Sequence, residues 1–160
     1  MALPRIAAAV VGTAMIATCA VAQPASRGVD PDASVRINQI QVIGTHNSNH
    51  AGLLAGIAKL LKQNAPQQTA ALDHAHADLA TQLNRGIRQI ELDIFPDSKG
   101  GLYARPLGPR LVAQAGLPAD PDPYANGVML KPGFKVMHVQ DIDYASNCQP
   151  FTACLKIVRA

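Results

Sequence analysis

The sequence predicts an α/β fold built on a parallel sheet, and three observations indicate it. Strand-like runs of apolar residues occur at 37–43, 87–95 and 134–139. Stretches with a helical period separate or follow these runs, as is typical of parallel pairing. Each run also leads into polar, titratable residues, and the carboxyl ends of parallel strands meet at one edge of a sheet.

The N-terminal stretch has the pattern of a targeting segment. Arg5 precedes an apolar run over 6–19, and Ala20-Val21-Ala22 forms a cleavage site of small residues. The run is shorter than the roughly 20 residues that a membrane-spanning helix needs. We therefore predict a signal peptide over 1–22 and a secreted or periplasmic protein. A lipoprotein signal that ends at Cys19 is the weaker alternative.

The first strand and helix follow a short polar segment. Residues 23–36 contain prolines and a glycine, so we expect a flexible lead-in there. We expect the domain itself over 37–160, beginning with the strand at 37–43. Apolar residues at helical spacing then predict a helix over 51–64 that ends near Pro66.

A second helix is indicated by four residues that share one helical face. These residues are Leu72, His76, Leu79 and Leu83. Gly86 is well placed as the glycine that ends this helix. Alternating apolar residues then predict a strand over 87–95, which Pro96 closes.

The rest of the chain predicts a long loop, a strand and a helix. Residues 97–132 are rich in proline and glycine and show no period, and long loops in compact domains are usually functional or mobile. The third strand follows at 134–139. A helix is expected between 148 and 159, where apolar residues gather on one side.

Cleavage of the signal peptide would remove Cys19 and leave two cysteines. Cys148 and Cys154 are six positions apart. An exported protein lies in a compartment that permits disulfides, so we predict a local bridge between them. Two free thiols on one helical face remain the alternative.

The overall composition indicates a globular protein and argues against nucleic-acid binding. The formal net charge is +3, with 14 Lys and Arg against 11 Asp and Glu, and this surplus is dispersed. Aromatic residues make up 4% and Trp is absent, so stacking platforms for bases are not available.

The residues at the strand ends predict a metal site. Glu91 and Asp93 lie two apart, so their side chains project from the same side of a strand. Like charges so close are costly unless a cation neutralises them. Together with Asn47 they form an all-oxygen donor set, which suits Ca²⁺. Two further titratable residues, His46 and His138, lie at the ends of the first and third strands.

Each of these residues also has an ordinary structural explanation. Glu91 and Asp93 could form a solvated face of an edge strand, and His138 could be a core histidine. We assign His74 and His76 to structure, since they lie on or beside an apolar helical face. The role of His50 is left open.

Three segments resemble phosphatidylinositol-specific phospholipases C. Residues 43–48 (IGTHNS) and 82–93 (QLNRGIRQIELD) are similar to two catalytic segments of that family. Residues 134–143 (FKVMHVQDID) resemble a third segment, as found in secreted bacterial calcium-dependent members. The resemblance runs from about residue 37 to the end of the chain.

The resemblance implies a TIM-type barrel whose carboxyl-end face carries the active site. It implies Ca²⁺ ligation by Asn47, Glu91 and Asp93, and catalytic roles for His46 and His138. In that family the inositol 2-hydroxyl attacks the phosphodiester of phosphatidylinositol, releasing diacylglycerol and a cyclic inositol phosphate. The implied partners are a phospholipid or other phosphodiester substrate and, transiently, a membrane surface.

The resemblance also implies that the barrel is incomplete here. A full barrel takes about 250 residues, whereas we count three predicted strands before Ala160. The family's further acidic Ca²⁺ ligand lies on the next strand, beyond Ala160. We therefore expect an N-terminal portion with the first strands and helices only, inactive by itself.

Two other functions remain open at this stage. A glycerophosphodiester phosphodiesterase-like barrel also combines histidines with a Glu-x-Asp motif, but it usually has Arg-Gly after its histidine, and here Asn47 follows His46. A non-catalytic secreted module that binds lipid or sugar, built from a decayed barrel, is the alternative from another class.

Overall fold

The structure is a computed structural model that describes residues 30–160. The predicted signal peptide and the first part of the lead-in lie outside the described residues. The described chain forms two units, residues 30–40 and residues 41–160. Within the described range, every helix is too short or too polar to cross a membrane.

The first unit holds two single turns, α1 (Pro31–Ser34) and η1, a 3₁₀ helix over Ile37–Gln39. The predicted strand over 37–43 is therefore wrong: residues 37–39 form this turn, and residues 40–43 belong to no strand. The side chain of Gln39 accepts a hydrogen bond from the backbone N–H of Arg36 at 3.0 Å, which stabilises the turn. Strand pairing begins only at β1 (Gly44–Thr45), because only there does a neighbouring strand offer partners.

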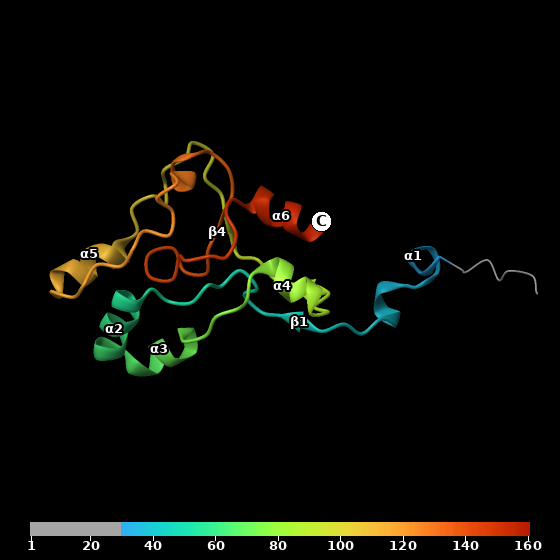
Figure 1. The fold of residues 1–160 in the computed structure, drawn as a ribbon, viewed down its shortest axis with the longest axis horizontal. Helices are drawn as coiled ribbons and strands as arrows, with labels where there is room; N and C mark the ends of the chain where they lie inside the picture. Colours follow the sequence, from blue (N-terminus) through green and yellow to red (C-terminus); the bar gives the residue numbers. More distant parts are fainter. Residues whose placement is uncertain (1–29) are drawn as a thin grey trace, which may run out of the picture. The chain divides into compact units, whose positions relative to one another are not determined.

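The second unit is a mixed α/β domain with two small sheets (Figure 1). β1 pairs in parallel with β2 (Gln89–Ile90), as predicted. β3 (Ile94–Phe95) pairs antiparallel with β4 (Lys135–Val136), so the prediction of an all-parallel sheet is wrong for this pair. The described residues do not form a closed barrel.

The predicted strand at 87–95 is split in two for an identifiable reason. Between β2 and β3, the N–H and C=O of Glu91 bond to Ser48 instead of continuing a sheet ladder. The backbone C=O of Asp93 accepts a bond from the N–H of Met137 at 3.2 Å. The chain therefore changes partners within this stretch, from β1 on one side to β4 on the other.

The helices of the first half begin at clear signals. α2 (Ala55–Asn64) confirms most of the helix predicted over 51–64. α3 (Pro66–Leu72) starts at its proline, whose missing N–H costs nothing at the first position of a helix. The second predicted helix is wrong before α4 (Leu79–Asn84), because Asp78 caps the start by accepting a bond from the N–H of Thr81 at 2.9 Å.

The predicted long loop at 97–132 contains α5 (Leu107–Gln114) and η2 (Val128–Leu130), so this prediction needs correction. Pro109 lies in the first turn of α5, where backbone N–H groups have no partner within the helix. Asp141 supplies partners from outside: its carboxylate accepts from the N–H of Leu107 at 2.9 Å and its C=O from Gly108 at 2.8 Å.

The C-terminal helix and its disulfide agree with the sequence. α6 spans Phe151–Arg159. Cys148 and Cys154 form a disulfide with Cα atoms 5.4 Å apart, as predicted. Cys154 is fully buried, so the bridge fastens α6 to the interior rather than to a surface loop.

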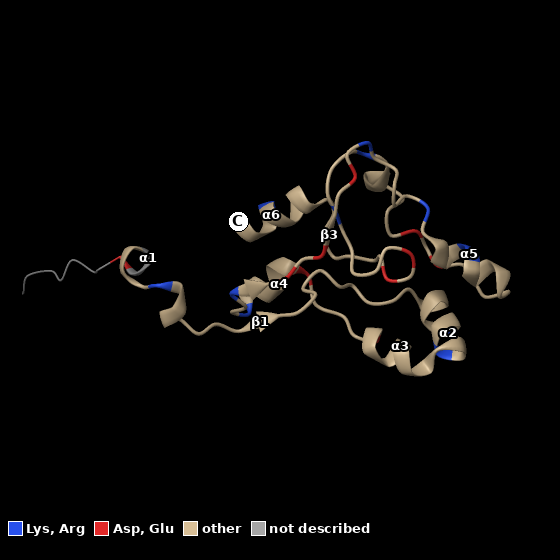
Figure 2. Ribbon diagram, turned by 180° about the vertical axis from the view of Figure 1, so that it is seen from behind, with Lys and Arg blue, Asp and Glu red and all other residues tan. Residues whose placement is uncertain are grey.

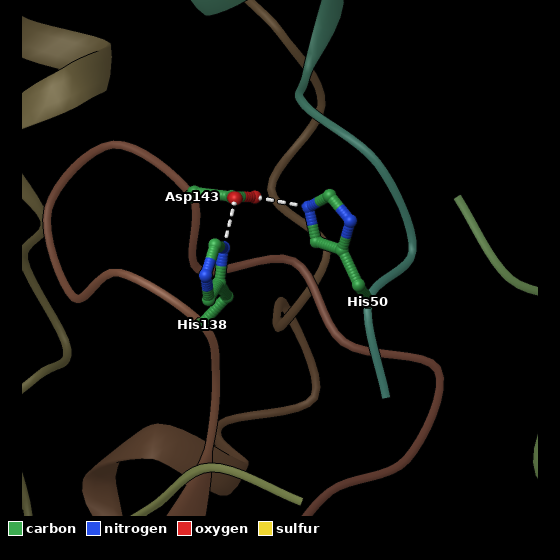
Figure 3. A group of neighbouring side chains, drawn as sticks. All are labelled: His50, His138 and Asp143. Carbon is green, nitrogen blue, oxygen red and sulfur yellow. Dashed lines mark hydrogen bonds and ion pairs between the residues drawn. The ribbon is translucent and has the colours of Figure 1, made fainter. Parts of the chain in front are cut away.

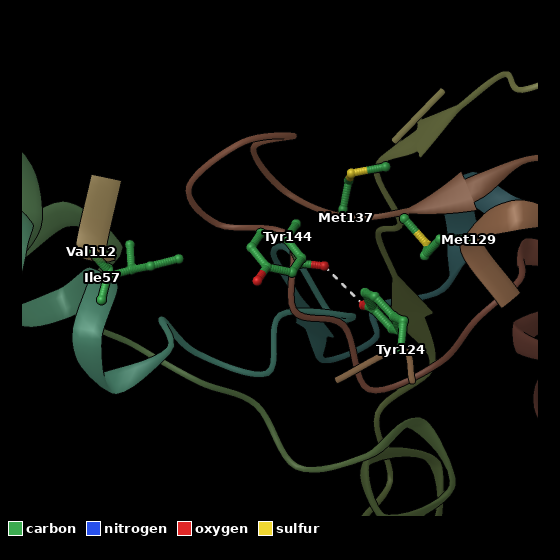
Figure 4. Packing of buried hydrophobic residues seen from close by; sticks show 6 residues of the cluster. All are labelled: Ile57, Val112, Tyr124, Met129, Met137 and Tyr144. Carbon is green, nitrogen blue, oxygen red and sulfur yellow. Dashed lines mark hydrogen bonds between the residues drawn. The ribbon is translucent and has the colours of Figure 1, made fainter. Parts of the chain in front are cut away.

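Two apolar clusters hold the second unit together. In the larger one, Ile57 of α2 packs with Val112 of α5, and Met129 and Met137 lie near a tyrosine pair, Tyr124 and Tyr144 (Figure 4). The O–H of Tyr124 donates to the backbone C=O of Tyr144 at 2.9 Å, so this hydroxyl is satisfied although it is buried.

The smaller cluster lies between α4 and α6. It consists of Leu79, Val136, Cys148 and Cys154. Because Val136 of β4 is completely buried here, the cluster packs β4 against both helices.

A buried ion pair joins the start of β4 to the loop after β3. The Nζ of Lys135 lies 3.3 Å from the Oδ2 of Asp97, and both side chains are almost fully buried. Asp97 also accepts bonds from the N–H groups of Gly100 and Leu102. Each charge therefore depends on the other, since a lone buried charge has no solvent to stabilise it.

Asp97→Ala is therefore expected to lower the free energy of unfolding by about 3–5 kcal/mol, the cost of leaving a buried charge unpaired. The measurement is urea denaturation of the full chain followed by circular dichroism. Asp73→Ala is the matched control, since Asp73 forms an exposed pair with Lys62. The control should cost at most about 1 kcal/mol. Equal losses in the two variants would contradict the prediction.

Candidate active site

The first site segment is a tight turn over residues 45–50. Asn47 has a φ of 50°, in the left-handed region that asparagine tolerates better than most residues. The N–H of His50 donates to the C=O of Asn47 at 2.8 Å and closes the turn. The turn places Asn47 in a buried position, while the side chain of His46 remains 77% exposed.

Ser48 and Gln82 hold this turn in place. The O–H of Ser48 donates to the C=O of Thr45 at 2.9 Å, and its oxygen accepts from the N–H of Glu91. The Nε2 of Gln82, on α4, donates to the C=O of Ser48 at 2.8 Å, and its Oε1 accepts from the hydroxyl of Thr45. Asn147 donates to the same C=O of Ser48 from the C-terminal part of the chain.

The second site segment lies directly beside the turn. The Nε2 of His46 is 3.7 Å from the Oε2 of Glu91, whose side chain is 43% exposed. The backbone N–H of Asp93 points to the Oδ1 of Asn49 at 3.4 Å. The Oδ2 of Asp93 is buried and has no hydrogen-bond partner among the described residues. This carboxylate oxygen is available to a ligand.

The third site segment is joined to the second through the backbone. The backbone N–H of Met137 donates to the C=O of Asp93, so the next residue, His138, lies beside the second segment. The Nδ1 of His138 is 2.7 Å from the Oδ2 of Asp143, and the Oδ1 of Asp143 is 2.7 Å from the Nε2 of His50 (Figure 3). Asp143 thus lies between two imidazole rings that come from different segments.

The structure therefore brings the three predicted segments side by side, with different contacts for each residue. His46 approaches Glu91, whereas His138 is bonded to Asp143. Among the described residues, the structure records no hydrogen bond from the side chains of Asn47, Glu91 or Asp93 to His138. Acidic positions occur around the junction of these segments and in the loop after β4 (Figure 2).

Two buried residues of this region were missed or left open by the sequence analysis. Asp143 carried no assigned role, and the role of His50 was undecided; both are fully buried. They are 93 positions apart in the sequence, so no local spacing could connect them. The one available signal was that Asp143 belongs to the same family-like segment as His138.

The other two histidines surround this pair. The ring of His74 lies 4.3 Å from that of His50, and burial together with the nearby His50 lowers the pKa of His74. The Nε2 of His76 lies within hydrogen-bonding distance of the C=O of His46, at 2.8 Å. Both residues lie in the segment before α4, not on a helical face as predicted, because α4 begins only at Leu79.

A family model described as phosphoinositide phospholipase C, Ca²⁺-dependent, matches residues 35–160. The chain belongs to this family. No curated protein and no solved structure matches the chain. The matched range contains all three site segments.

The donor set predicted for the family's Ca²⁺ fits an oxygen-preferring cation. Asp93 offers a buried oxygen that has no hydrogen-bond partner among the described residues. Glu91, two residues earlier in the same segment, offers a half-exposed carboxylate. Carboxylate and amide oxygens are the ligands that Ca²⁺ takes. Among the described residues, the cluster of His50, His138 and Asp143 is the one group of His, Cys, Asp or Glu whose donor atoms all lie within 4.8 Å. Two of its three donors are nitrogens, which Ca²⁺ does not favour.

The left-handed turn at Asn47 gives a prediction about backbone strain. In Asn47→Ala the Cβ remains at a positive φ, where it is unfavourable, and the polar group is lost. Asn47→Gly has no Cβ, so this backbone conformation is no longer strained. We expect the glycine variant to be more stable than the alanine variant by about 1 kcal/mol. Urea denaturation of both variants measures this difference. Both lack the side-chain amide, so a lower stability of the glycine variant would show that the conformation is not what matters.

Proposed function

We propose that this chain belongs to a Ca²⁺-dependent phosphoric diester hydrolase that cleaves phosphatidylinositol-type lipids to diacylglycerol and cyclic inositol phosphate. The observation that carries the proposal is the family match over residues 35–160, a range that includes every proposed site residue. The unpartnered oxygen of Asp93 supports it from the structure.

Asn47, Glu91 and Asp93 would hold the Ca²⁺ ion. When bound, Ca²⁺ would make the inositol hydroxyl a better nucleophile and offset the charge of the phosphate. Glu91 also lies near the exposed ring of His46 and orients it. Glu91 would therefore serve two purposes, ligation of Ca²⁺ and placement of His46.

The two histidines would divide the work on the phosphate. His46 is largely exposed and can approach the phosphoryl oxygens, where it would stabilise the charge that develops during attack. His138 is 23% exposed, so one edge of its ring can reach a substrate while the other is held by Asp143. It would donate the proton that the departing glycerol oxygen needs.

We further propose that these segments belong to a TIM-type barrel. The parallel pairing of β1 with β2, and the convergence of the site residues beyond the ends of β1, β2 and β4, support this arrangement. A phospholipid substrate also requires transient contact with a membrane surface.

Removal of Ca²⁺ should abolish phosphatidylinositol hydrolysis. In the natural full-length protein we expect release of cyclic inositol phosphate with Ca²⁺ and none in excess chelator. Asp93→Asn should weaken Ca²⁺ binding measured by calorimetry and reduce turnover by about 100-fold or more. Asp73→Asn, on the exposed surface pair, is the matched control and should behave like the parent. Full activity in chelator would reject the proposal.

His46→Ala and His138→Ala should each reduce kcat by about 10²–10⁴-fold without unfolding the protein, because both remove a group that acts on charge or protons in the transition state. Phosphatidylinositol turnover and far-ultraviolet circular dichroism are the measurements. Turnover of glycerophosphodiesters in place of phosphatidylinositol would instead assign the protein to the related class of glycerophosphodiesterases.

We also propose export from the cytoplasm, on the basis of the N-terminal sequence. The exported protein should begin at Gln23, since the predicted cleavage site Ala20-Val21-Ala22 ends at Ala22. N-terminal sequencing of the protein recovered from the periplasm or medium measures this. Recovery of the uncleaved chain from the cytoplasm would contradict it.

A further inference from the structure

The loop after β4 returns Asp143 to the side of His138. Val139 and Asp143 exchange two backbone hydrogen bonds of 2.9 Å, which close a tight loop. The carboxylate of Asp143 is completely buried, and His138 lies only five positions earlier. A buried carboxylate needs hydrogen-bond donors on its oxygens, because water cannot supply them.

The two imidazole rings supply these donors. An ionised carboxylate can only accept, so the bond to Oδ2 places a proton on the Nδ1 of His138. The bond to Oδ1 likewise places a proton on the Nε2 of His50. The Nε2 of His138 is then the ring atom that remains for chemistry.

The distances argue for hydrogen bonds and against a second metal ion in this cluster. Each nitrogen lies 2.7 Å from its carboxylate oxygen, the length of a charge-assisted hydrogen bond. Zinc takes nitrogen and oxygen ligands at about 2.0–2.2 Å in a tetrahedron, which keeps two ligands more than 3 Å apart. Each of these two nitrogen–oxygen pairs is closer than two ligands of one zinc ion would be, which favours the hydrogen bonds.

We propose that Asp143 is the positioning residue of His138 and that His50 anchors Asp143 by its second oxygen. The inference rests on the proposed function for its catalytic consequence, but not for its structural content. Asp143 fixes the proton on Nδ1 and the plane of the His138 ring, and its charge stabilises the imidazolium form, in which Nε2 carries the second proton, the one given to the leaving oxygen. His50 contributes one donor and takes no part in the reaction.

The direct test is the tautomeric state of the histidines in the parent protein. Long-range ¹H–¹⁵N correlation spectra of the ¹⁵N-histidine-labelled full chain report which nitrogen of each ring carries hydrogen. We expect Nδ1–H on His138 and Nε2–H on His50. A bare Nδ1 on His138 would overturn the proposal, whatever the protein hydrolyses.

Variants separate positioning from simple support of the fold. The amide of Asp143→Asn can accept from only one ring. We therefore expect a changed His138 tautomer signal and a loss of up to about 100-fold in kcat, with a nearly unchanged KM. Asp141→Asn is the matched control in the same loop: it caps α5 and touches neither ring, so kcat should stay within a few-fold of the parent. Similar kcat values for the two variants would overturn the proposal.

His50 offers a rescue experiment. His50→Gln keeps a donor near the position of Nε2 and should retain most of the activity, whereas His50→Phe removes the donor and should lose at least about tenfold in kcat. Equal activity of the two variants would overturn the anchoring role. If phosphatidylinositol is not a substrate at all, the tautomer signals still decide the positioning role, so the two failures are distinguishable. Tight binding of Zn²⁺ with loss of both tautomer signals would also overturn it.

Discussion

The site depends on the buried hydroxyl and backbone of Ser48. Its hydroxyl links the turn after β1 to Glu91, and its C=O receives bonds from Gln82 and Asn147. Because Ser48 is completely buried, none of these bonds can be exchanged for water, and an unmade one would cost about 1–3 kcal/mol. One residue thus connects β1, α4, the second site segment and the chain before α6.

This connection explains how strands of two residues can position the candidate site. The order of the segments is set by single backbone bonds, from Ser48 to Glu91 and from Asp93 to Met137, rather than by a wide ladder. Side chains then complete the arrangement, with Asn49 reaching Asp93 and Gln82 reaching the turn. The register of the site is therefore fixed locally, even where regular sheet is short.

The sequence predicted those features that depend on local pattern. The apolar face of α6, the spacing of Cys148 and Cys154 and the parallel pairing of β1 and β2 were all accessible in this way. α5 was missed because Pro109 and the nearby glycines suggested a loop, while its first N–H groups are satisfied by the distant Asp141. The bond between His50 and Asp143 could not be predicted either, because it joins residues 93 positions apart that meet only in the folded chain.

Three carboxylates of the second unit differ in the partners of their oxygens, and the difference agrees with the roles proposed above. Asp97 is paired with Lys135, a permanent cation, and with backbone N–H groups, which suits a structural element. Asp143 is paired with imidazoles, of which His138 keeps an exposed edge, so its burial favours a group that can transfer a proton. Asp93 keeps one buried oxygen without any partner among the described residues. That oxygen would gain from the arrival of a cation, as the ligand role proposed for Asp93 requires.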